Sequence, residues 1–120
     1  IYGGEDFLSF LDRLRSAWPS VEIGYFQSNV EGELINRLQE VGFSAHGIIM
    51  NAGGYTHTSV AIADAIAAIT TPVIEVHISN VYAREEFRHH SLMAANCRGV
   101  VAGLGLKGYE LALEYLMSDR

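Results

Sequence analysis

Glu75 and His77 are the two residues whose types and spacing most directly suggest chemistry. They lie two positions apart in the stretch 73–78, which is typical of a strand, so both side chains should point to the same face. A carboxylate beside an imidazole can fix the imidazole tautomer and so create a general acid or base. The alternative is an ion pair without a catalytic role. Because a charge inside a covered sheet is costly unless it is partnered, that alternative also requires a special environment.

A polar loop follows another predicted strand. Residues 48–50 form an unbroken apolar run, which is typical of a strand buried on both faces. Asn51, two glycines, His57 and several hydroxyl side chains follow it. In an open α/β sheet, ligands bind outside the carboxyl ends of the strands, so this loop is a candidate binding site. The alternative is an ordinary strand-to-helix turn in which Thr58 or Ser59 caps the next helix.

The residues that follow the strand 73–78 are polar and charged. Free backbone N–H groups at Ser79 and Asn80 could hold an anion, and a plain turn is the alternative. Arg84 and Arg88 are four residues apart. On a helix they would share a face and could bind a carboxylate or the hydroxyl groups of a ligand. The alternative for this segment is a solvated, charged helix.

No motif in the sequence predicts a cofactor or a metal. The five histidines include no His-x-x-x-His pair, and there is no Cys-x-x-Cys motif. The glycines at 103, 105 and 108 match a dinucleotide-binding pattern formally, but they follow the last predicted strand, so we interpret them as a tightly packed turn. Cys97 has no evident base partner and is interpreted as a packed thiol.

Composition excludes several classes of protein. The chain has 120 residues, of which 49% are hydrophobic, and its formal net charge is −6. This length suits one domain, and the charge argues against a nucleic-acid partner. The sequence contains no stretch that could cross a bilayer and no signal-peptide pattern. A single cysteine excludes an internal disulfide and fits a reducing compartment. We therefore expect a cytoplasmic protein without a membrane or nucleic-acid partner.

The spacing of apolar residues predicts the elements that must position these side chains. Helices are predicted at 5–18, 31–41 (ended by Gly42), 60–69 and 107–117. Strands are predicted at 21–27, 47–50, 73–78 and 99–104, with a short helical turn at 84–89. This alternation predicts an α/β fold, a doubly wound parallel sheet with helices on both faces. Such a sheet needs a first strand to support the opening helix. We expect that strand upstream, so that residues 1–120 form a single, N-terminally incomplete domain.

Four blocks of residues together resemble the type II 3-dehydroquinate dehydratase family. The blocks are 1–3 (IYG), 27–32 (QSNVEG), 51–59 (NAGGYTHTS) and 75–91 (EVHISNVYAREEFRHHS). The resemblance implies a flavodoxin-like fold and trimers assembled into dodecamers. It also implies the anti elimination of water from 3-dehydroquinate to give 3-dehydroshikimate, through an enolate, in the shikimate pathway. No metal, cofactor or Schiff base is implied.

The resemblance further implies roles for single residues. Tyr2 would be the base that takes the proton from C2, His77 the general acid and Glu75 its orienting carboxylate. The residues implied in substrate binding are Asn51, His57, Asp64, Ile78, Ser79, Arg84 and Arg88. Asn51, His57 and Arg88 would hold hydroxyl groups of the substrate. The backbone groups of Ile78 and Ser79 would bind its carboxylate. Arg84 would lie near the tyrosine, and Asp64 would reach the site of a neighbouring subunit.

The main alternative is a non-catalytic, flavodoxin-like binding or structural module. A flavin-binding module would need glycines and hydroxyl groups after the first strand, and a receiver domain would need clustered aspartates at strand ends. The strand ends here carry Asn51 and His77 instead. Tyr2, Glu75 and His77 argue against a structural subunit without chemistry.

Overall fold

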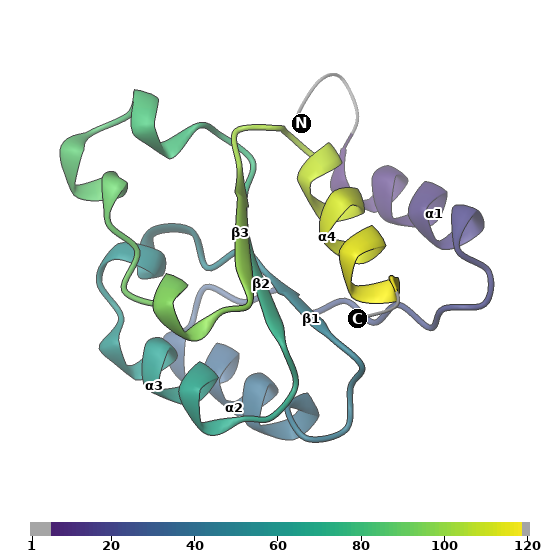
Figure 1. Cartoon of the computed structure of the whole chain (residues 1–120), viewed down its shortest axis with the longest axis horizontal. Helices are drawn as coiled ribbons and strands as arrows, with labels where there is room; N and C mark the ends of the chain where they lie inside the picture. Colours follow the sequence, from purple (N-terminus) through teal and green to yellow (C-terminus); the bar gives the residue numbers. More distant parts are fainter. Residues whose placement is uncertain (1–5, 119–120) are drawn as a thin grey trace.

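One parallel sheet organises the fold of this protein (Figure 1). The computed structural model describes residues 6–118. Its strands are β1 (Ile48–Met50), β2 (Val73–His77) and β3 (Gly99–Ala102). Its α-helices are α1 (Phe7–Ala17), α2 (Glu31–Val41), α3 (Val60–Ala68) and α4 (Lys107–Met117). The strands lie in the order β1-β2-β3, and all are parallel. The predicted α/β architecture with a parallel sheet is therefore confirmed.

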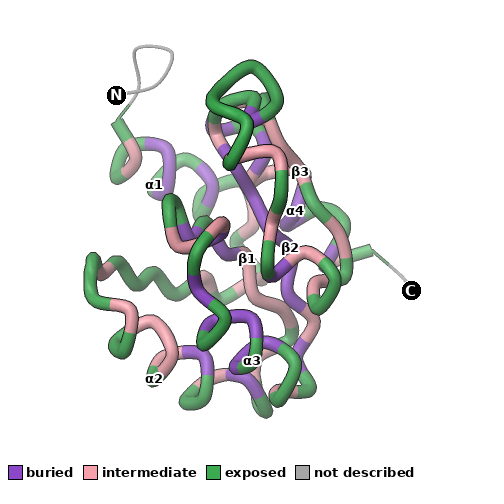
Figure 2. The backbone as a smooth tube through the Cα atoms, turned by 90° about the vertical axis from the view of Figure 1, so that its left-hand side faces the viewer, coloured by how far each residue is buried: buried purple, intermediate pink, exposed green. Residues whose placement is uncertain are grey.

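The helices cover the two faces of the sheet in pairs (Figure 1). Helices α2 and α3 form one core with Met50 and Val73, whereas α4 packs on Ile74 and Val76. Helix α1 joins the side of α4. Figure 2 shows the central strand β2 buried along its length, in keeping with its burial residue by residue. Because strand side chains alternate, Glu75 shares the face of Val73, which is the side of α3.

Side-chain caps fix where two of the helices begin. The Asp6 carboxylate accepts a hydrogen bond from the backbone N–H of Ser9 at 2.8 Å, and this bond lowers the pKa of Asp6. At the start of α3, the Ser59 hydroxyl accepts from the Ile62 N–H at 2.9 Å. Of the two caps that the sequence suggests for this helix, the structure therefore selects Ser59 rather than Thr58.

The predicted strand at 21–27 is wrong. This segment belongs to no β-ladder among residues 6–118. Its alternating pattern still places Val21 and Ile23 against the α1 and α4 core. However, the Ile23 carbonyl accepts two hydrogen bonds from the Arg15 side chain, at 3.1 and 2.7 Å, instead of a neighbouring strand. Alternation predicts which side chains are buried, whereas a strand also needs a hydrogen-bonding neighbour.

The glycine-rich stretch after β3 forms a tight turn, as interpreted from the sequence. Gly103 and Gly105 have positive φ angles of 85° and 61°, which favour glycine. Their N–H groups donate to the carbonyls of His77 and Ile78, at 3.1 and 3.0 Å. The turn therefore ties the end of β3 to the end of β2, where the candidate site lies.

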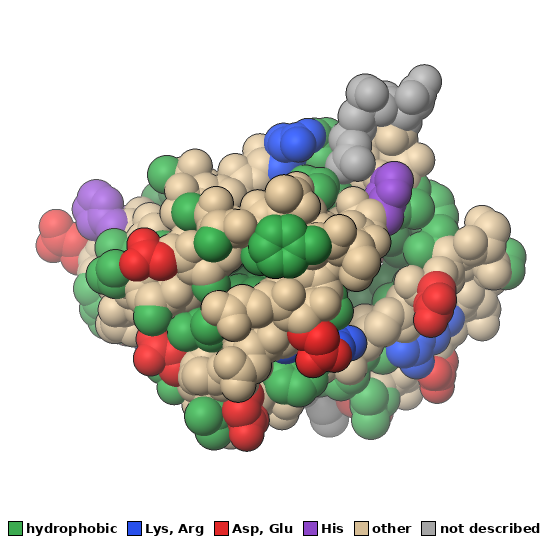
Figure 3. All heavy atoms as spheres, turned by 90° about the horizontal axis from the view of Figure 1, so that it is seen from below, with side chains coloured by type: hydrophobic (Ala, Val, Ile, Leu, Met, Phe, Trp, Pro, Cys, Tyr) green, Lys and Arg blue, Asp and Glu red, His purple; other side chains and the backbone are tan. Residues whose placement is uncertain are grey.

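Two further observations concern the charged side chains on the surface and the apolar character of the helices. On the face shown in Figure 3, Lys and Arg side chains are scattered and form no continuous patch. None of the helices within residues 6–118 combines the length and the apolar character that crossing a membrane requires.

Candidate active site

Glu75 and His77 form a buried, hydrogen-bonded pair at the carboxyl end of β2. Their exposed fractions are 1% and 6%, and His77 Nε2 lies 2.5 Å from Glu75 Oε2. The prediction that both side chains share one face is confirmed. The second carboxylate oxygen, Oε1, accepts a hydrogen bond from the Ser91 hydroxyl at 2.8 Å. The carboxylate therefore has a partner on each oxygen, which offsets the cost of burying its charge.

The loop after β1 brings a second imidazole to this pair. It contains the short 3-10 helix η1 (Gly53–His57), and the His57 ring stacks on His77 with ring centroids 6.2 Å apart. His57 Nδ1 lies 2.8 Å from the His90 carbonyl oxygen. Because a carbonyl only accepts, Nδ1 carries a proton, so Nε2 of His57 is the acceptor nitrogen when the ring is neutral.

Asn51 occupies the carboxyl end of β1, and its side chain is held in place on both sides. Its Oδ1 accepts from the Gly53 N–H at 3.0 Å, and its Nδ2 donates to the Tyr109 hydroxyl at 3.1 Å. Gly53 has a φ of +57°, which lets the chain turn back on this amide. Sequence reasoning did not identify Tyr109, because it lies 58 residues away on α4.

The arginines of the next segment are arranged differently from the prediction. Of the short helical turn predicted at 84–89, the structure shows the 3-10 helix η3 (Glu86–His89). A second 3-10 helix, η2 (Val81–Ala83), precedes it, and Arg84 between the two is extended. Arg84 and Arg88 therefore do not share a helix face. Both approach Glu85, at 3.9 and 2.8 Å from its carboxylate oxygens, and the Arg88 hydrogen bond holds the pKa of Glu85 below its usual range.

The other predicted site residues lie at the sheet edge, on α3 or beyond the described residues. Ile78 and Ser79 directly follow β2, and Ser79 is exposed. Asp64 is exposed on α3. Tyr2, the predicted base, lies outside the described residues. Within residues 6–118, no group of three or more His, Cys, Asp or Glu side chains is arranged to hold a metal ion.

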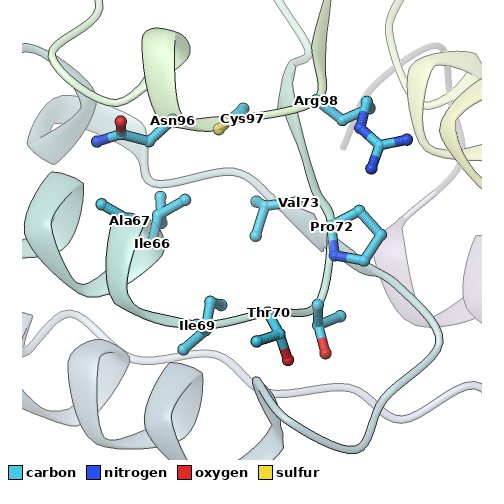
Figure 4. A pocket seen from close by; sticks show the side chains of 10 residues that line it. Ile66, Ala67, Ile69, Thr70, Pro72, Val73, Asn96, Cys97 and Arg98 are labelled. Atoms are coloured by element: carbon cyan, nitrogen blue, oxygen red, sulfur yellow. The ribbon is translucent and has the colours of Figure 1, made fainter.

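A surface pocket of about 320 Å³ lies at the opposite end of the sheet (Figure 4). It is lined by the end of α3 and by the residues that precede β2 and β3. Its polar side chains have partners within the fold. Thr71 Oγ1 donates to the Ala45 carbonyl at 2.9 Å, and Asn96 Nδ2 donates to the Ala63 carbonyl at 2.9 Å. We assign the candidate site to the carboxyl ends of the strands, where the titratable side chains gather.

Cys97 is predicted to react slowly. Burial raises the pKa of its thiol to about 12, with a further contribution from the charge of Glu75. Because the thiolate is the nucleophile, the three-unit rise from a pKa of 9.0 should slow modification by a thiol reagent at pH 8 about 1,000-fold. The measurement compares the folded protein with the protein in denaturant. Equal rates in the two states would contradict this prediction.

The model of the family "Dehydroquinase class II" matches residues 1–117. The chain belongs to the class II dehydroquinase family. The resemblance stated from the four sequence blocks is therefore confirmed.

Curated proteins and solved structures add detail to this dehydroquinase assignment. The chain is similar to the 3-dehydroquinate dehydratase of Campylobacter jejuni, with 57% identity over 84% of this chain and 64% of the relative. It thus spans somewhat less than two thirds of the length of that relative. It is also 58% identical to the 3-dehydroquinate dehydratase of Exiguobacterium sp., over 98% of this chain and 81% of that protein.

Two crystal structures of type II dehydroquinases share the fold. The structure from Butyrivibrio crossotus has a TM-score of 0.91 and 44% identity, and it covers 98% of this chain and 84% of that chain. The structure from Propionibacterium acnes has a TM-score of 0.89 and 38% identity, over 99% of this chain and 83% of that one. The flavodoxin-like fold expected from the sequence is therefore confirmed.

Proposed function

We propose that this protein is a hydro-lyase that converts 3-dehydroquinate to 3-dehydroshikimate in the shikimate pathway. The observation that carries the proposal is the buried His77–Glu75 pair, with His77 Nε2 2.5 Å from the carboxylate, in a chain of the class II dehydroquinase family. Such a pair can hold an imidazolium and deliver its proton to a leaving group. Relatives named 3-dehydroquinate dehydratase support the same substrate.

The proposed reaction is an anti elimination of water that needs one base and one acid. Tyr2 takes the proton from C2, and the electron pair of that C–H bond enters an enolate. The electron pair then forms the new carbon–carbon double bond, and the departing hydroxyl takes a proton from His77 and leaves as water. Because His77 Nε2 is bound to Glu75, the proton is delivered from Nδ1. Glu75 stabilises the imidazolium and fixes the orientation of the ring.

Three side chains from the segments that follow β1 and β2 are proposed to hold the hydroxyl groups of the substrate. His57 offers Nε2 as an acceptor, since its Nδ1 is bound to the His90 carbonyl. Asn51 uses one amide hydrogen on Tyr109 and offers the other. Arg88 is oriented through its Nε by Glu85 and offers its terminal nitrogens.

The remaining proposed contacts lie at the edge of the sheet and between subunits. Backbone N–H groups of Ile78 and Ser79, at the carboxyl end of β2, bind the substrate carboxylate. We propose that the positive charge of Arg84 assists the base Tyr2. We further propose a homo-oligomer of trimers assembled into a dodecamer. In it, Asp64, which is exposed on α3, reaches the site of a neighbouring subunit. The proposed mechanism requires no cofactor.

The test is a direct assay of dehydration with a matched variant. Purified protein is mixed with 3-dehydroquinate, and the ultraviolet absorbance of the conjugated product is followed. We expect turnover in the range of typical enzymes, about 1 to 10³ s⁻¹. Tyr2→Phe removes only the hydroxyl and should lower kcat by about 10²- to 10⁴-fold. Activity of the unchanged protein no greater than that of Tyr2→Phe would refute the proposed function.

A further inference from the structure

Ser91 contacts the catalytic pair through a hydroxyl whose direction the structure determines. Its Oγ accepts hydrogen bonds from the backbone N–H groups of Met93 and Ala94, at 3.2 and 3.0 Å. A serine hydroxyl has two acceptor positions and one proton to donate. Since both acceptor positions are occupied, the proton must be donated to Glu75 Oε1, 2.8 Å away.

The direction of this bond affects the imidazole. The hydrogen bond that the Ser91 hydroxyl donates to Oε1 makes this oxygen of Glu75 an acceptor. The other oxygen, Oε2, then accepts from His77 Nε2, at 2.5 Å. Nε2 therefore carries a proton, and Nδ1 is the ring nitrogen that can exchange a proton with a ligand. The hydroxyl thus determines which nitrogen of His77 does the chemistry.

The turn that carries Ser91 is anchored to the loop after β1 on both sides. On one side, the His90 carbonyl accepts from His57 Nδ1 at 2.8 Å. On the other side, the Leu92 N–H donates to the Thr56 carbonyl at 2.8 Å. Met93, two residues on, is 1% exposed and belongs to the core. The position of the hydroxyl is therefore fixed by contacts that do not involve the hydroxyl itself.

We propose that Ser91 is a positioning residue of the active site, which holds Glu75 as an acceptor and so sets the tautomer of the general acid His77. Its role in dehydration rests on the proposed function. The titratable groups around Glu75 are His77 on the same strand, His57 stacked on that ring, and the protonated thiol of Cys97. Ser91 adds a neutral donor to this set.

The first measurement requires no substrate. Long-range ¹H–¹⁵N correlation spectra of the full chain report which nitrogen of His77 carries the proton. We expect the Nε2–H tautomer in the unchanged protein and a mixture of tautomers in Ser91→Ala. Ser91→Thr keeps the hydroxyl and should restore the tautomer. Ser28→Ala is the matched control, because the Ser28 hydroxyl accepts from the Val30 N–H and bonds to Glu33 on the exposed start of α2.

The second measurement is the steady-state kinetics of turnover, which separates kcat from KM. Ser91→Ala should lower kcat about tenfold, with KM changed less than about twofold. If Ser91→Ala does not fold, Ser91→Cys replaces it, since a thiol keeps the shape but is a weak donor.

The outcomes separate this proposal from the proposed function. An unchanged His77 tautomer and an unchanged kcat in the folded Ala or Cys variant would overturn the role of Ser91, even in an active enzyme. The expected tautomer change in a protein without dehydratase activity would support the role of Ser91 as a positioning residue and refute only the proposed function.

Discussion

Replacing His77 with asparagine is expected to lower kcat for the dehydration of 3-dehydroquinate by about 10²- to 10⁴-fold. Asparagine has a similar size and can still donate to Glu75, but it cannot supply a proton to the departing hydroxyl. The effect should fall on kcat rather than on KM, because the proton is transferred only in the transition state.

The measurement is steady-state kinetics at saturating substrate, with unfolding curves to establish that the variants remain folded. His46→Asn is the matched control, since His46 lies at 3.0 Å from the Leu116 carbonyl on α4, away from the candidate site. We expect its turnover to stay within about twofold of the unchanged protein. A His77→Asn variant with comparable turnover would exclude His77 as the general acid.

Replacing Gly42 with alanine is expected to lower the free energy of unfolding by about 1 to 3 kcal/mol. An added Cβ would lie 2.4 Å from Ile69 Cγ2 and 2.5 Å from the Leu38 carbonyl oxygen, which is backbone and cannot move aside. The Gly42 carbonyl also accepts from the N–H groups of Thr70 and Thr71, at 3.1 and 2.8 Å. These bonds join the end of α2 to the segment that leads into β2.

A second glycine in the same stretch of chain provides a control of opposite sign. Gly32 lies exposed near the start of α2, and an added Cβ would meet nothing within 4 Å. Gly32→Ala should therefore raise the free energy of unfolding by about 0.5 to 1 kcal/mol, because alanine loses less backbone entropy in a helix. Urea unfolding of both variants is the measurement. Equal effects of the two substitutions would contradict the argument from close packing.

The role of Gly42 illustrates how a correct position can have an unexpected cause. The sequence predicts Gly42 as the end of the second helix, and α2 does end at Val41. The usual reason for such a glycine is a positive φ angle, but φ here is −71°. The requirement is space, since the Ile69 side chain occupies the place where a Cβ of residue 42 would lie. Because the two residues lie 27 positions apart, no local pattern in the sequence reveals this contact.

The sequence by itself determined the elements whose periodicity is local. The bounds of α2 and α4 agree with the predicted 31–41 and 107–117, because apolar spacing within one helix is visible in one stretch of chain. The shared face of Glu75 and His77 follows in the same way from a spacing of two on one strand. The family followed from long motifs, which the match over residues 1–117 confirms.

Only the tertiary structure decided which hydrogen-bond and ion-pair partners the polar groups of these segments have. The segment 21–27 has the alternation of a strand, but its Ile23 carbonyl is bound by the Arg15 side chain. Arg84 and Arg88 meet at Glu85 through two 3-10 turns rather than on one helix. The first outcome depends on a hydrogen bond from a helix to the segment that follows it, and the second on an extended residue between two 3-10 helices. The periodicity of apolar residues encodes neither of them.

The same reason explains why Ser91 was not identified as a separate site residue. Sixteen positions separate it from Glu75, and its hydroxyl is directed by two N–H groups of the turn that follows it. Residue types and spacing determined that a carboxylate and an imidazole would meet. Only the folded chain decided that the Ser91 hydroxyl binds this carboxylate, because Ser91 belongs to another segment of the chain.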